Sequence, residues 1–471
     1  MNEATVTNSD CLEWLRTLPD NSADAIVCDP PAGISFMSST WDSDKGGRKR
    51  WIAWLAEVMA EALRVAKPGA HALVWALPRT SHWTGTALED AGWEPRDVIA
   101  HIFSTGFPKS VNVSKHIDAK LGAVREVVGE NPNVIRSRAS LGKTTSLHTG
   151  DTFTGIADVT TAATPEAKHH DGYHSALKPS SEHWYLCRKP LDGTIAGNVL
   201  THGTGAINVD GCRVRGVGEV PGVVAIVGGD DADAIAVKIQ LQVQAAGRWP
   251  PNTVFSHAEG CVPTGRCADD CPIAELDRQS GNTTSPASVT SGGNRSNLSG
   301  MNGLKERRDV PCFGDSGTAS RFFPCFRYQA KASVAETELG CEDLQPRQVD
   351  DSREPEAVGA NNPRNCGGGQ RKNHHPTKKS VDLMRWLCRL VAPPPNFKTG
   401  EAPLILDPFT GSGSTGVACV LEGFRFAGSE LDPAFVAIAR ARIAAAQANR
   451  LVTQDGKTVV SSVHPAQMEL L

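Results

Sequence analysis

Residues 404–433 read LILDPFTGSGSTGVACVLEGFRFAGSELDP, and this stretch decides the fold. The apolar run Leu404-Ile405-Leu406 is typical of a buried strand. The glycines that follow allow a sharp turn and the close approach of a ligand, and VACVLEG then predicts a helix that ends at Gly423. A second strand ends at Glu430, where an acid can accept hydrogen bonds from both hydroxyls of a ribose. The stretch therefore predicts a strand–helix–strand unit that binds a nucleoside.

The same glycines also fit the GxGxxG fingerprint of dinucleotide-binding proteins, which on its own is a weak signal. Asp407-Pro408-Phe409-Thr410 precedes them, which the fingerprint does not require. A dinucleotide fold would need a second mononucleotide-binding half downstream, and only about 40 residues follow Pro433. We therefore reject an NAD-dependent dehydrogenase and expect the other half of the sheet upstream.

Composition limits the other possibilities. The chain has 471 residues, a net charge of −4 and a pI near 6.4, so contact with nucleic acid would have to come from local basic patches. Thirteen cysteines are scattered along the chain and no signal peptide is apparent, which favours reduced thiols and a cytoplasmic location. No run of 18 apolar residues occurs, so we expect no membrane span.

Residues 1–110 alternate between helix and strand patterns. A helix over 11–18 follows Asp10, a strand over 25–28 ends in Asp29-Pro30-Pro31, and a helix over 50–66 is expected to stop at Lys67-Pro68-Gly69. This alternation predicts an α/β fold with three α/β/α layers around a parallel, doubly wound sheet. Asp29 then lies at the carboxyl end of a strand, where such sheets place their functional residues.

The middle of the chain has a different character. Residues 111–365 lose their periodicity and are rich in Ser, Thr, Asn and Gly, so we expect a large, loop-rich insertion with disordered segments. Two segments with the pattern of regular structure interrupt it, one at 182–191 and a valine-rich one at 220–243. Regular structure resumes over 366–450, and 451–471 form a tail.

Three motifs together resemble the amino-methyltransferases of DNA. They are Asp29-Pro30-Pro31 at a strand end, HPTKK at 375–379 before a helix, and DPFTGSGSTG at 407–416 followed by an acidic strand end. The order of the motifs matches the circularly permuted subgroup often called β, and GFPKSVNVSKHID at 106–118 resembles phage and prophage members. The resemblance implies the fold of class I methyltransferases that use S-adenosylmethionine (SAM). It makes 1–110 the catalytic half, 366–450 the SAM-binding half and 111–365 the target-recognition region.

The resemblance also implies roles for individual residues. The catalytic residues would be Asp29, Pro30 and Pro31. The Asp29 carboxylate and the Pro30 carbonyl would accept hydrogen bonds from the exocyclic amine of a base flipped out of the duplex. This localises the lone pair of the amine for in-line transfer of the methyl group. The cofactor-binding residues would be Asp10, Thr377, Lys378, Asp407, Pro408, Phe409, Gly411, Ser412, Gly413 and Glu430. Asp10 also reads as the N-cap of the following helix.

One position departs from the family pattern. Ala32 follows the two prolines, where the family has an aromatic residue that stacks on the flipped base, a contact worth about 1–3 kcal/mol. Phe36 and Trp41 are the nearest substitutes, and each also reads as a core residue. In the family, Asp at the first position of the motif favours adenine and Ser favours cytosine, so Asp29 favours adenine.

We therefore expect a site-specific methyltransferase that methylates adenine N6 in double-stranded DNA. The alternatives are a cytosine-N4 enzyme and a homologue that binds SAM and DNA without turnover. A cytosine-C5 enzyme is disfavoured: Pro311-Cys312 and Pro324-Cys325 could supply the nucleophile, but the Glu-Asn-Val element of that class is absent. A restriction endonuclease partner, a monomeric or dimeric state, and a phage or bacterial origin in a bacterial host cell stay open.

A weaker pattern lies in the insertion. His257, Cys261, Cys267 and Cys271 have three, five and three residues between them, spacings that permit zinc ligation. No CxxC pair is present, so the sequence favours ordinary loop residues over a metal site.

Overall fold

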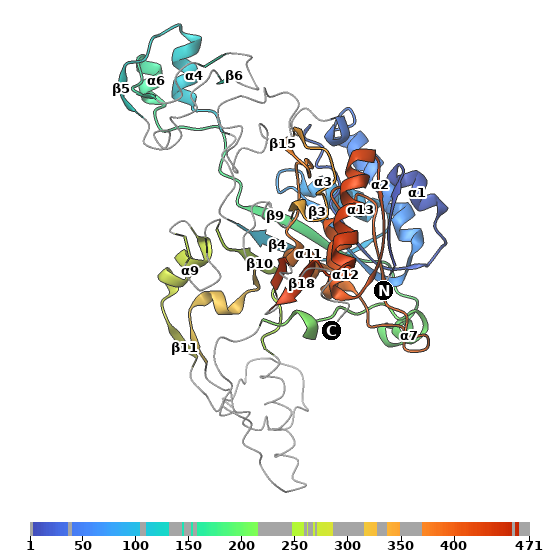
Figure 1. The fold of residues 1–471 in the computed structure, drawn as a ribbon. Coiled ribbons are helices and arrows are strands. Elements are labelled where there is room, and N and C mark those ends of the chain that lie inside the picture. The colour runs from blue at the N-terminus through green and yellow to red at the C-terminus, as the bar shows by residue number, and fades with distance from the viewer. Residues whose placement is uncertain are drawn as a thin grey trace, which may run out of the picture. The chain divides into compact units, whose positions relative to one another are not determined.

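The computed structural model describes residues 3–35, 40–103, 110–130, 144–145, 152–153, 158–214, 247–258, 261, 267–268, 271–285, 315–326, 337–348, 370–454 and 457–460 (Figure 1). The chain divides into two compact units. The first contains residues 1–100, 105–208 and 329–471, and the second contains 101–104 and 209–328. No helix among the described residues has both the length and the apolar character needed to cross a bilayer.

The sheet of the first unit joins the two ends of the sequence. Its strand order is β1(Ala4–Asn8), β17(Arg425–Glu430), β16(Leu404–Asp407), β2(Ala23–Cys28), β3(Ala66–Ala76), β9(Ser181–Arg188) and β4(Glu94–Ile102). The first five of these strands run parallel. Because β16 pairs with β2, with Ile405 opposite Ala25, the strands of the glycine motif do find their partner upstream, as the sequence predicts.

Helices cover both faces of this sheet. On one face α1(Cys11–Thr17), α2(Arg48–Val65) and α3(Ser81–Asp90) pack together, and on the other α11(Val381–Val391), α12(Ser414–Glu422) and α13(Pro433–Gln447) do (Figure 1). Every residue of β2 is buried. Since side chains alternate along a strand, Ile26 and Cys28 join the core under α1–α3, while Ala25 and Val27 are buried on the other face. This confirms the predicted three-layer α/β/α class.

Two features of the sheet differ from the expectation. The helix ends before Lys67-Pro68-Gly69 as expected, but these residues already belong to β3, which begins directly after α2, and they form an irregularity between the pairs Ala23–Ala66 and Ala25–His71. The side chain of Asn198 in α7(Ile195–His202) holds this irregularity by donating to the Pro68 carbonyl at 2.9 Å. The sheet is also not purely parallel, because β9 runs antiparallel to β3.

The region predicted as one insertion, 111–365, is divided in the structure. β9 lies within it in sequence but belongs to the central sheet, because its apolar residues Trp184, Leu186 and Cys187 are buried there. Residues 209–328 belong to the second unit. The valine-rich segment at 220–243 lies outside the described residues.

A buried ion pair organises the part of the first unit around α4(Val113–Lys120) and α6(Pro165–His169). Asp118 accepts hydrogen bonds from the N–H groups of Ala163 and Thr164 at 3.0 Å, and its carboxylate lies 2.5 Å from the Arg125 guanidinium. Although burial opposes the charge, these donors lower the pKa of Asp118 to about 2. The carboxylate therefore fastens α4 to the start of α6.

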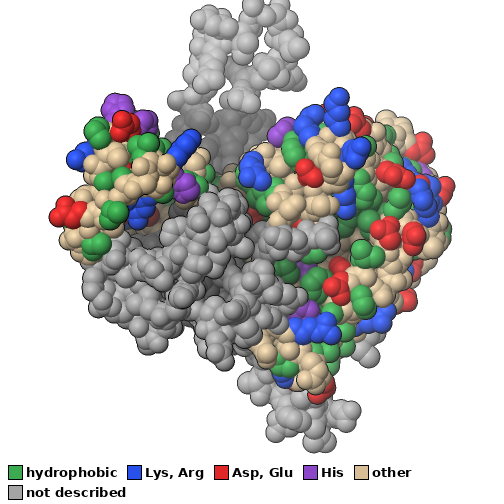
Figure 2. All heavy atoms as spheres, turned by 90° about the horizontal axis from the view of Figure 1, so that it is seen from above, with side chains coloured by type: hydrophobic (Ala, Val, Ile, Leu, Met, Phe, Trp, Pro, Cys, Tyr) green, Lys and Arg blue, Asp and Glu red, His purple; other side chains and the backbone are tan. Residues whose placement is uncertain are grey.

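The remaining elements are short. They are η2(Thr40–Asp42), β5(Val127–Glu130), β6(Thr144–Thr145), β7(Thr152–Phe153), β8(Asp158–Thr160), β14(Arg347–Gln348), β15(Gln370–Arg371), β18(Leu451–Gln454) and β19(Lys457–Val460) in the first unit, and η4(Asp210–Cys212), β10(Thr253–Ser256), α9(Pro272–Ser280), β11(Thr283–Ser285), β12(Asp315–Gly317), η5(Ala319–Phe322) and β13(Cys325–Phe326) in the second. Figure 2 shows acidic and basic side chains intermingled among the described residues of the visible face, in keeping with the net charge of −4.

Candidate active site

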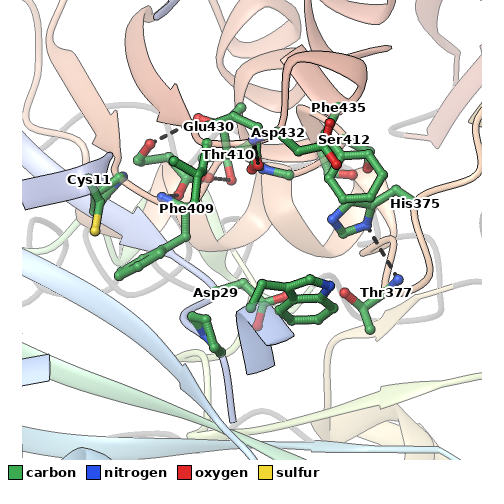
Figure 3. Close-up of a pocket in the computed structure, with 18 of the residues that line it drawn as sticks. Cys11, Asp29, His375, Thr377, Phe409, Thr410, Ser412, Glu430, Asp432 and Phe435 are labelled. Carbon is green, nitrogen blue, oxygen red and sulfur yellow. Dashed lines mark hydrogen bonds between the residues drawn. The ribbon is translucent and has the colours of Figure 1, made fainter. Parts of the chain in front are cut away.

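A cavity of about 530 Å³ opens at the carboxyl ends of the parallel strands. β16 ends there at Asp407, β17 at Glu430, and β2 is followed there by Asp29. Figure 3 shows Phe409, Asp29 and His375 around this cavity. The arrangement follows from the parallel sheet, which brings the ends of neighbouring strands to one edge. The cavity also has the size of a small-molecule site, roughly 300–1,000 Å³.

Asp407 holds the glycine loop in shape. Its Oδ1 accepts from the Phe409 N–H at 3.0 Å, and its Oδ2 accepts from the Thr415 hydroxyl at 2.6 Å. The carboxyl is buried, which raises its pKa to about 7 even though both donors favour the charged form. Asp407 lines the cavity, but both of its oxygens are directed to the loop.

Close packing explains two of the loop glycines. Gly411 has φ +52°, and a Cβ there would lie 2.8 Å from the His375 ring. Gly413 has φ +79°, and a Cβ there would lie 2.9 Å from the backbone of Ala439 in α13. Both conformations favour glycine. Gly411 lines the cavity, and Gly413 acts by letting α13 approach the loop.

A buried arginine supports the loop from behind. Arg442 in α13 is only 1% exposed, and its guanidinium donates to the Ser412 carbonyl at 2.6 Å. The same nitrogen reaches the hydroxyls of Ser412 at 3.1 Å and Ser414 at 3.2 Å. The guanidinium thus fixes the loop backbone and places positive charge beneath the cavity floor.

Glu430 lies at the far side of the loop. Its Oε2 accepts from the Gly411 N–H at 2.9 Å and its Oε1 accepts from the Asp432 N–H at 2.9 Å. Burial raises the pKa of Glu430, although these donors oppose the shift. Because β1 and β17 pair with Asn8 opposite Glu430, the acid lies at the same edge as the residues that follow β1.

Asp10 belongs to this edge, where it caps α1 and also lines the cavity. Its Oδ1 caps α1 by accepting from the Leu12 N–H at 2.9 Å and from the Glu13 N–H at 3.3 Å. It also lines the cavity, as does Cys11, whose pKa burial raises to about 12. The Cys11 thiol is therefore uncharged at neutral pH.

A second cavity, of about 260 Å³, adjoins the first. The two cavities share Asp29, Pro31, Trp41, Thr377 and Lys379. Pro30, Ala32 and Trp75 line the second cavity only.

Trp41 is brought to the shared wall by the residue that follows it. Asp42 is buried, its Oδ1 accepts from the Gly33 N–H at 2.9 Å, and its carbonyl accepts from the Ser35 N–H at 2.7 Å. These bonds connect Asp42 to residues that follow Asp29, and the adjacent Trp41 lines both cavities. Phe36, the other predicted stacking residue, lies outside the described residues.

Asp29 makes an ion pair across the shared wall. The Lys379 ammonium lies 2.6 Å from Asp29 Oδ2 and 4.2 Å from the centre of the Trp75 ring. Burial raises the pKa of Asp29, and Lys379 opposes that shift. Burial also disfavours the charge on Lys379, but the carboxylates of Asp29 and Glu182 outweigh it and raise its pKa. Each partner therefore favours the charged form of the other against the effect of burial.

The HPTKK segment contributes more residues than the sequence suggests. Thr377 lines both cavities, while Lys378 lines the second and donates to the Asn373 carbonyl at 3.0 Å. His375 packs edge-on against Phe435, at 4.6 Å between ring centres, and burial lowers its pKa to about 3, so its ring is neutral. Its Nδ1 accepts from the Thr377 N–H at 3.3 Å (Figure 3).

Sequence reasoning missed several lining residues. His375 and Lys379 stand in a motif that drew attention, and their basic character was the available signal. Lys45 begins a basic run, 45–50, whose charge was a signal for phosphate contact, whereas Trp54, Trp75 and Glu182 gave no such signal because each is remote in sequence from the motifs. Trp54 packs edge-on against Phe409 at 6.0 Å, and Lys45 lies 4.7 Å from the Trp54 ring. The other predicted cofactor residues, Pro408 and Ser412, line the first cavity.

The first cavity fits a nucleoside carrying a charged chain. An acid ends β17, where it can take a ribose, and Phe409 gives an apolar wall. The glycine loop lets the backbone approach the ligand at Gly411, and Lys379 adds positive charge at the wall. The second cavity adds a separate compartment beyond Asp29.

Parts of the chain are similar in sequence to known DNA methylases. The family model described as DNA methylase matches residues 327–441. A Type II methyltransferase, M.BamHI of Bacillus amyloliquefaciens, is 31% identical over 72 residues, which are 15% of this chain and 17% of the relative. The chain therefore spans less than a fifth of that relative's length in the match.

Two solved structures align with most of this chain, at low sequence identity. The M1.HpyAVI–SAM complex has a TM-score of 0.35 at 12% identity, with 93% of this chain and 98% of the other covered. The cytosine-N4-specific PvuII DNA methyltransferase has a TM-score of 0.39 at 10% identity, with 99% and 92% covered. The matched residues 327–441 include the glycine loop and the segment before it, so this part of the chain is similar to the DNA methylase family.

Proposed function

We propose that this chain is a SAM-dependent DNA methyltransferase that modifies adenine N6 at a specific site. The observation that carries the proposal is the position of Asp29-Pro30-Pro31. These residues form the wall between a cavity that suits a nucleoside and a second cavity with aromatic residues at its sides. A donor in the first cavity and a flipped base in the second would meet at Asp29.

The bound cofactor would supply an electrophilic methyl group on a sulfonium. The residues that suit it are Glu430 for the ribose hydroxyls, Phe409 for an apolar face, and the Gly411–Ser412 backbone for the amino-acid chain. Arg442 keeps that backbone in place. Lys379 and Thr377 give the cavity its positive and polar wall.

The chain's own part in the reaction is to activate the amine. An exocyclic amino group is a poor nucleophile because its lone pair is delocalised into the ring. The Asp29 carboxylate and the Pro30 carbonyl would each accept a hydrogen bond from one N–H group of the amine. These bonds would localise the lone pair on the nitrogen. Lys379 favours the ionised form of Asp29, which accepts hydrogen bonds only. Trp41 lines both cavities. It would stack on the flipped base in place of the aromatic residue that the family has at the position of Ala32.

The proposed base rests on Asp29. In the family that this chain resembles, Asp at the first position of the motif goes with adenine. Cytosine N4 is the second candidate, because the same geometry would activate either amine and the matching DNA methylase family includes both classes of enzyme.

The test is to sequence DNA from cells that express the wild type, Asp29→Ala or Asp90→Ala with a long-read method that reports modified bases. Asp90 ends α3 and is exposed, so its variant is the matched control. We expect N6-methyladenine in one sequence motif with the wild type and with Asp90→Ala, and none with Asp29→Ala. N4-methylcytosine would keep the mechanism and overturn the proposed base.

Purified Asp29→Ala is expected to bind the cofactor as the wild type does, measured by calorimetry. If the variant no longer binds the cofactor, Asp29 supports the first cavity and does not activate the amine. No modification by a soluble wild-type protein that binds the cofactor would favour the homologue without turnover.

A further inference from the structure

Four potential metal ligands meet in the second unit, and none of them lines either of the two cavities. His257 directly follows β10, Cys271 is the residue before α9, and Cys261 and Cys267 lie between them. The ligand atoms of all four side chains lie within 4.8 Å of one another. The spacing of these residues in the sequence favours ordinary loop residues over a metal site. It is therefore the fold that brings the four side chains together.

The distances match the edges of a tetrahedral zinc site. Zinc bonds of about 2.3 Å to sulfur and 2.0–2.1 Å to nitrogen, at tetrahedral angles, separate S from N by about 3.6 Å. The Nδ1 atom of His257 lies 3.5 Å from Cys267 Sγ and 3.6 Å from Cys271 Sγ. These two distances therefore have the length of an edge of the tetrahedron, and the other pairs of ligand atoms lie within 4.8 Å.

The surroundings also suit thiolates. The Ala268 N–H donates to Cys261 Sγ at 3.3 Å, a bond that favours the charged sulfur. Three sulfurs held this close together repel one another when they are ionised, and a cation at the centre removes that repulsion.

We propose that His257, Cys261, Cys267 and Cys271 bind one structural Zn²⁺ ion. Three sulfurs and one imidazole form the Cys3His set that zinc takes in closed sites, and this ligand softness selects zinc over magnesium or calcium. All four positions come from the protein. No position is left for water or substrate, so the ion serves the fold and not the methyl transfer.

The ion compensates for a small core. Among the residues that the structure describes, the apolar cluster at the four ligands has three buried members, Ala258, Cys271 and Ile273, with partly buried neighbours that include two of the ligands. Small folding units of this kind commonly need a metal or disulfides, and Cys261, Cys267 and Cys271 are free thiols. The ion joins the end of β10 to the start of α9. α9 in turn holds η5, because Asp277 of α9 accepts a hydrogen bond from the Ser320 N–H of η5 at 3.0 Å.

The first test measures metal in the full-length protein. Elemental analysis is expected to find about one zinc per chain, and replacement by Co²⁺ should give the strong visible absorption of a tetrahedral thiolate site. Cys267→Ser and Cys271→Ser should each lose the ion.

Cys325→Ser is the matched control. This thiol belongs to the same unit, and its Sγ faces the carbonyls of Ser320 and Phe323 at 3.8 and 3.4 Å, outside the four-residue set. It should keep the full zinc content. Loss of zinc in Cys325→Ser, or full zinc content in Cys271→Ser, would overturn the assignment.

A fourth variant covers the case in which ligand removal unfolds the unit. His257→Cys replaces the imidazole with a fourth thiolate, so it should retain about one zinc and shift the cobalt absorption. A wild-type protein that holds no zinc after incubation with excess Zn²⁺ and dialysis would refute the proposal. None of these measurements depends on methyl transfer.

Discussion

The substitution Asp407→Asn should make the protein more stable at alkaline pH. The Asp407 carboxyl is completely enclosed beneath the glycine loop, and burial raises its pKa from 3.8 to about 7. The folded protein therefore holds this proton more tightly than the unfolded chain does. The stabilisation that comes from the protonated carboxyl is complete below pH 4 and is lost as the pH rises to about 7.

The magnitude follows from the two pKa values. A difference of about 3 between them corresponds to about 4 kcal/mol of unfolding free energy at pH 8, as an upper bound. Asparagine has the same shape without the charge. Its amide would face the Thr415 hydroxyl, which must then accept instead of donate, at a cost of about 1 kcal/mol. The expected net gain at pH 8 is about 2–3 kcal/mol, and the variant should differ little from the wild type near pH 5.

The assay is thermal unfolding of the full-length protein without cofactor between pH 5 and 8. The midpoint of the wild type should fall relative to that of Asp407→Asn by several degrees across this range. Asp90→Asn, an exposed carboxamide at the end of α3, should follow the wild type at every pH. If Asp407→Asn also follows the wild type, or is less stable at pH 8, the carboxyl does not carry the strained charge that its burial implies.

Three further predictions concern the same site. Arg442→Met removes the donor to the Ser412 carbonyl and should weaken cofactor binding roughly ten-fold by calorimetry, which corresponds to about 1.4 kcal/mol, with Arg442→Lys in between; unchanged affinity would contradict the supporting role. Lys379→Gln removes the charge that opposes the rise in the pKa of Asp29, so the acidic limb of the rate profile should move to higher pH, and a limb at the wild-type position would show that the ion pair does not tune Asp29. Trp41→Ala should reduce methyl transfer at saturating cofactor by roughly ten-fold or more while Trp41→Phe retains most of it, and equal rates in both variants would exclude stacking by Trp41.

Local pattern was enough for much of the sheet. The strands at 25–28 and 404–406 and the helices around 50–66 and 381–391 are given by short-range periodicity and by the glycines and prolines that end them. Asp29 and Glu430 could be placed at strand ends for the same reason. The α/β class follows from this alternation, because parallel strands need helical connections.

The missed parts of the site depend on contacts between remote segments. Arg442 stands in an alanine-rich helix and reads as a surface residue, but the close approach of α13 to Gly413 buries it under the loop. The pairing of Lys379 with Asp29 joins residues 350 positions apart. β9 belongs to the sheet through pairing with β3, although its flanks read as insertion. The cysteine cluster depends in the same way on loop paths that no spacing rule describes.

The pairing of β16 with β2 has a consequence for biosynthesis. β2 is made early, and all of its residues are apolar or buried in the finished sheet, yet the strand that covers one of its edges is made only after most of the chain. At roughly 5–20 residues per second, the nascent chain exposes that edge for tens of seconds. An uncovered apolar edge is a template for aggregation. The order of the segments along the chain therefore leaves this edge of β2 unpaired until the strand before the glycine loop has been synthesised.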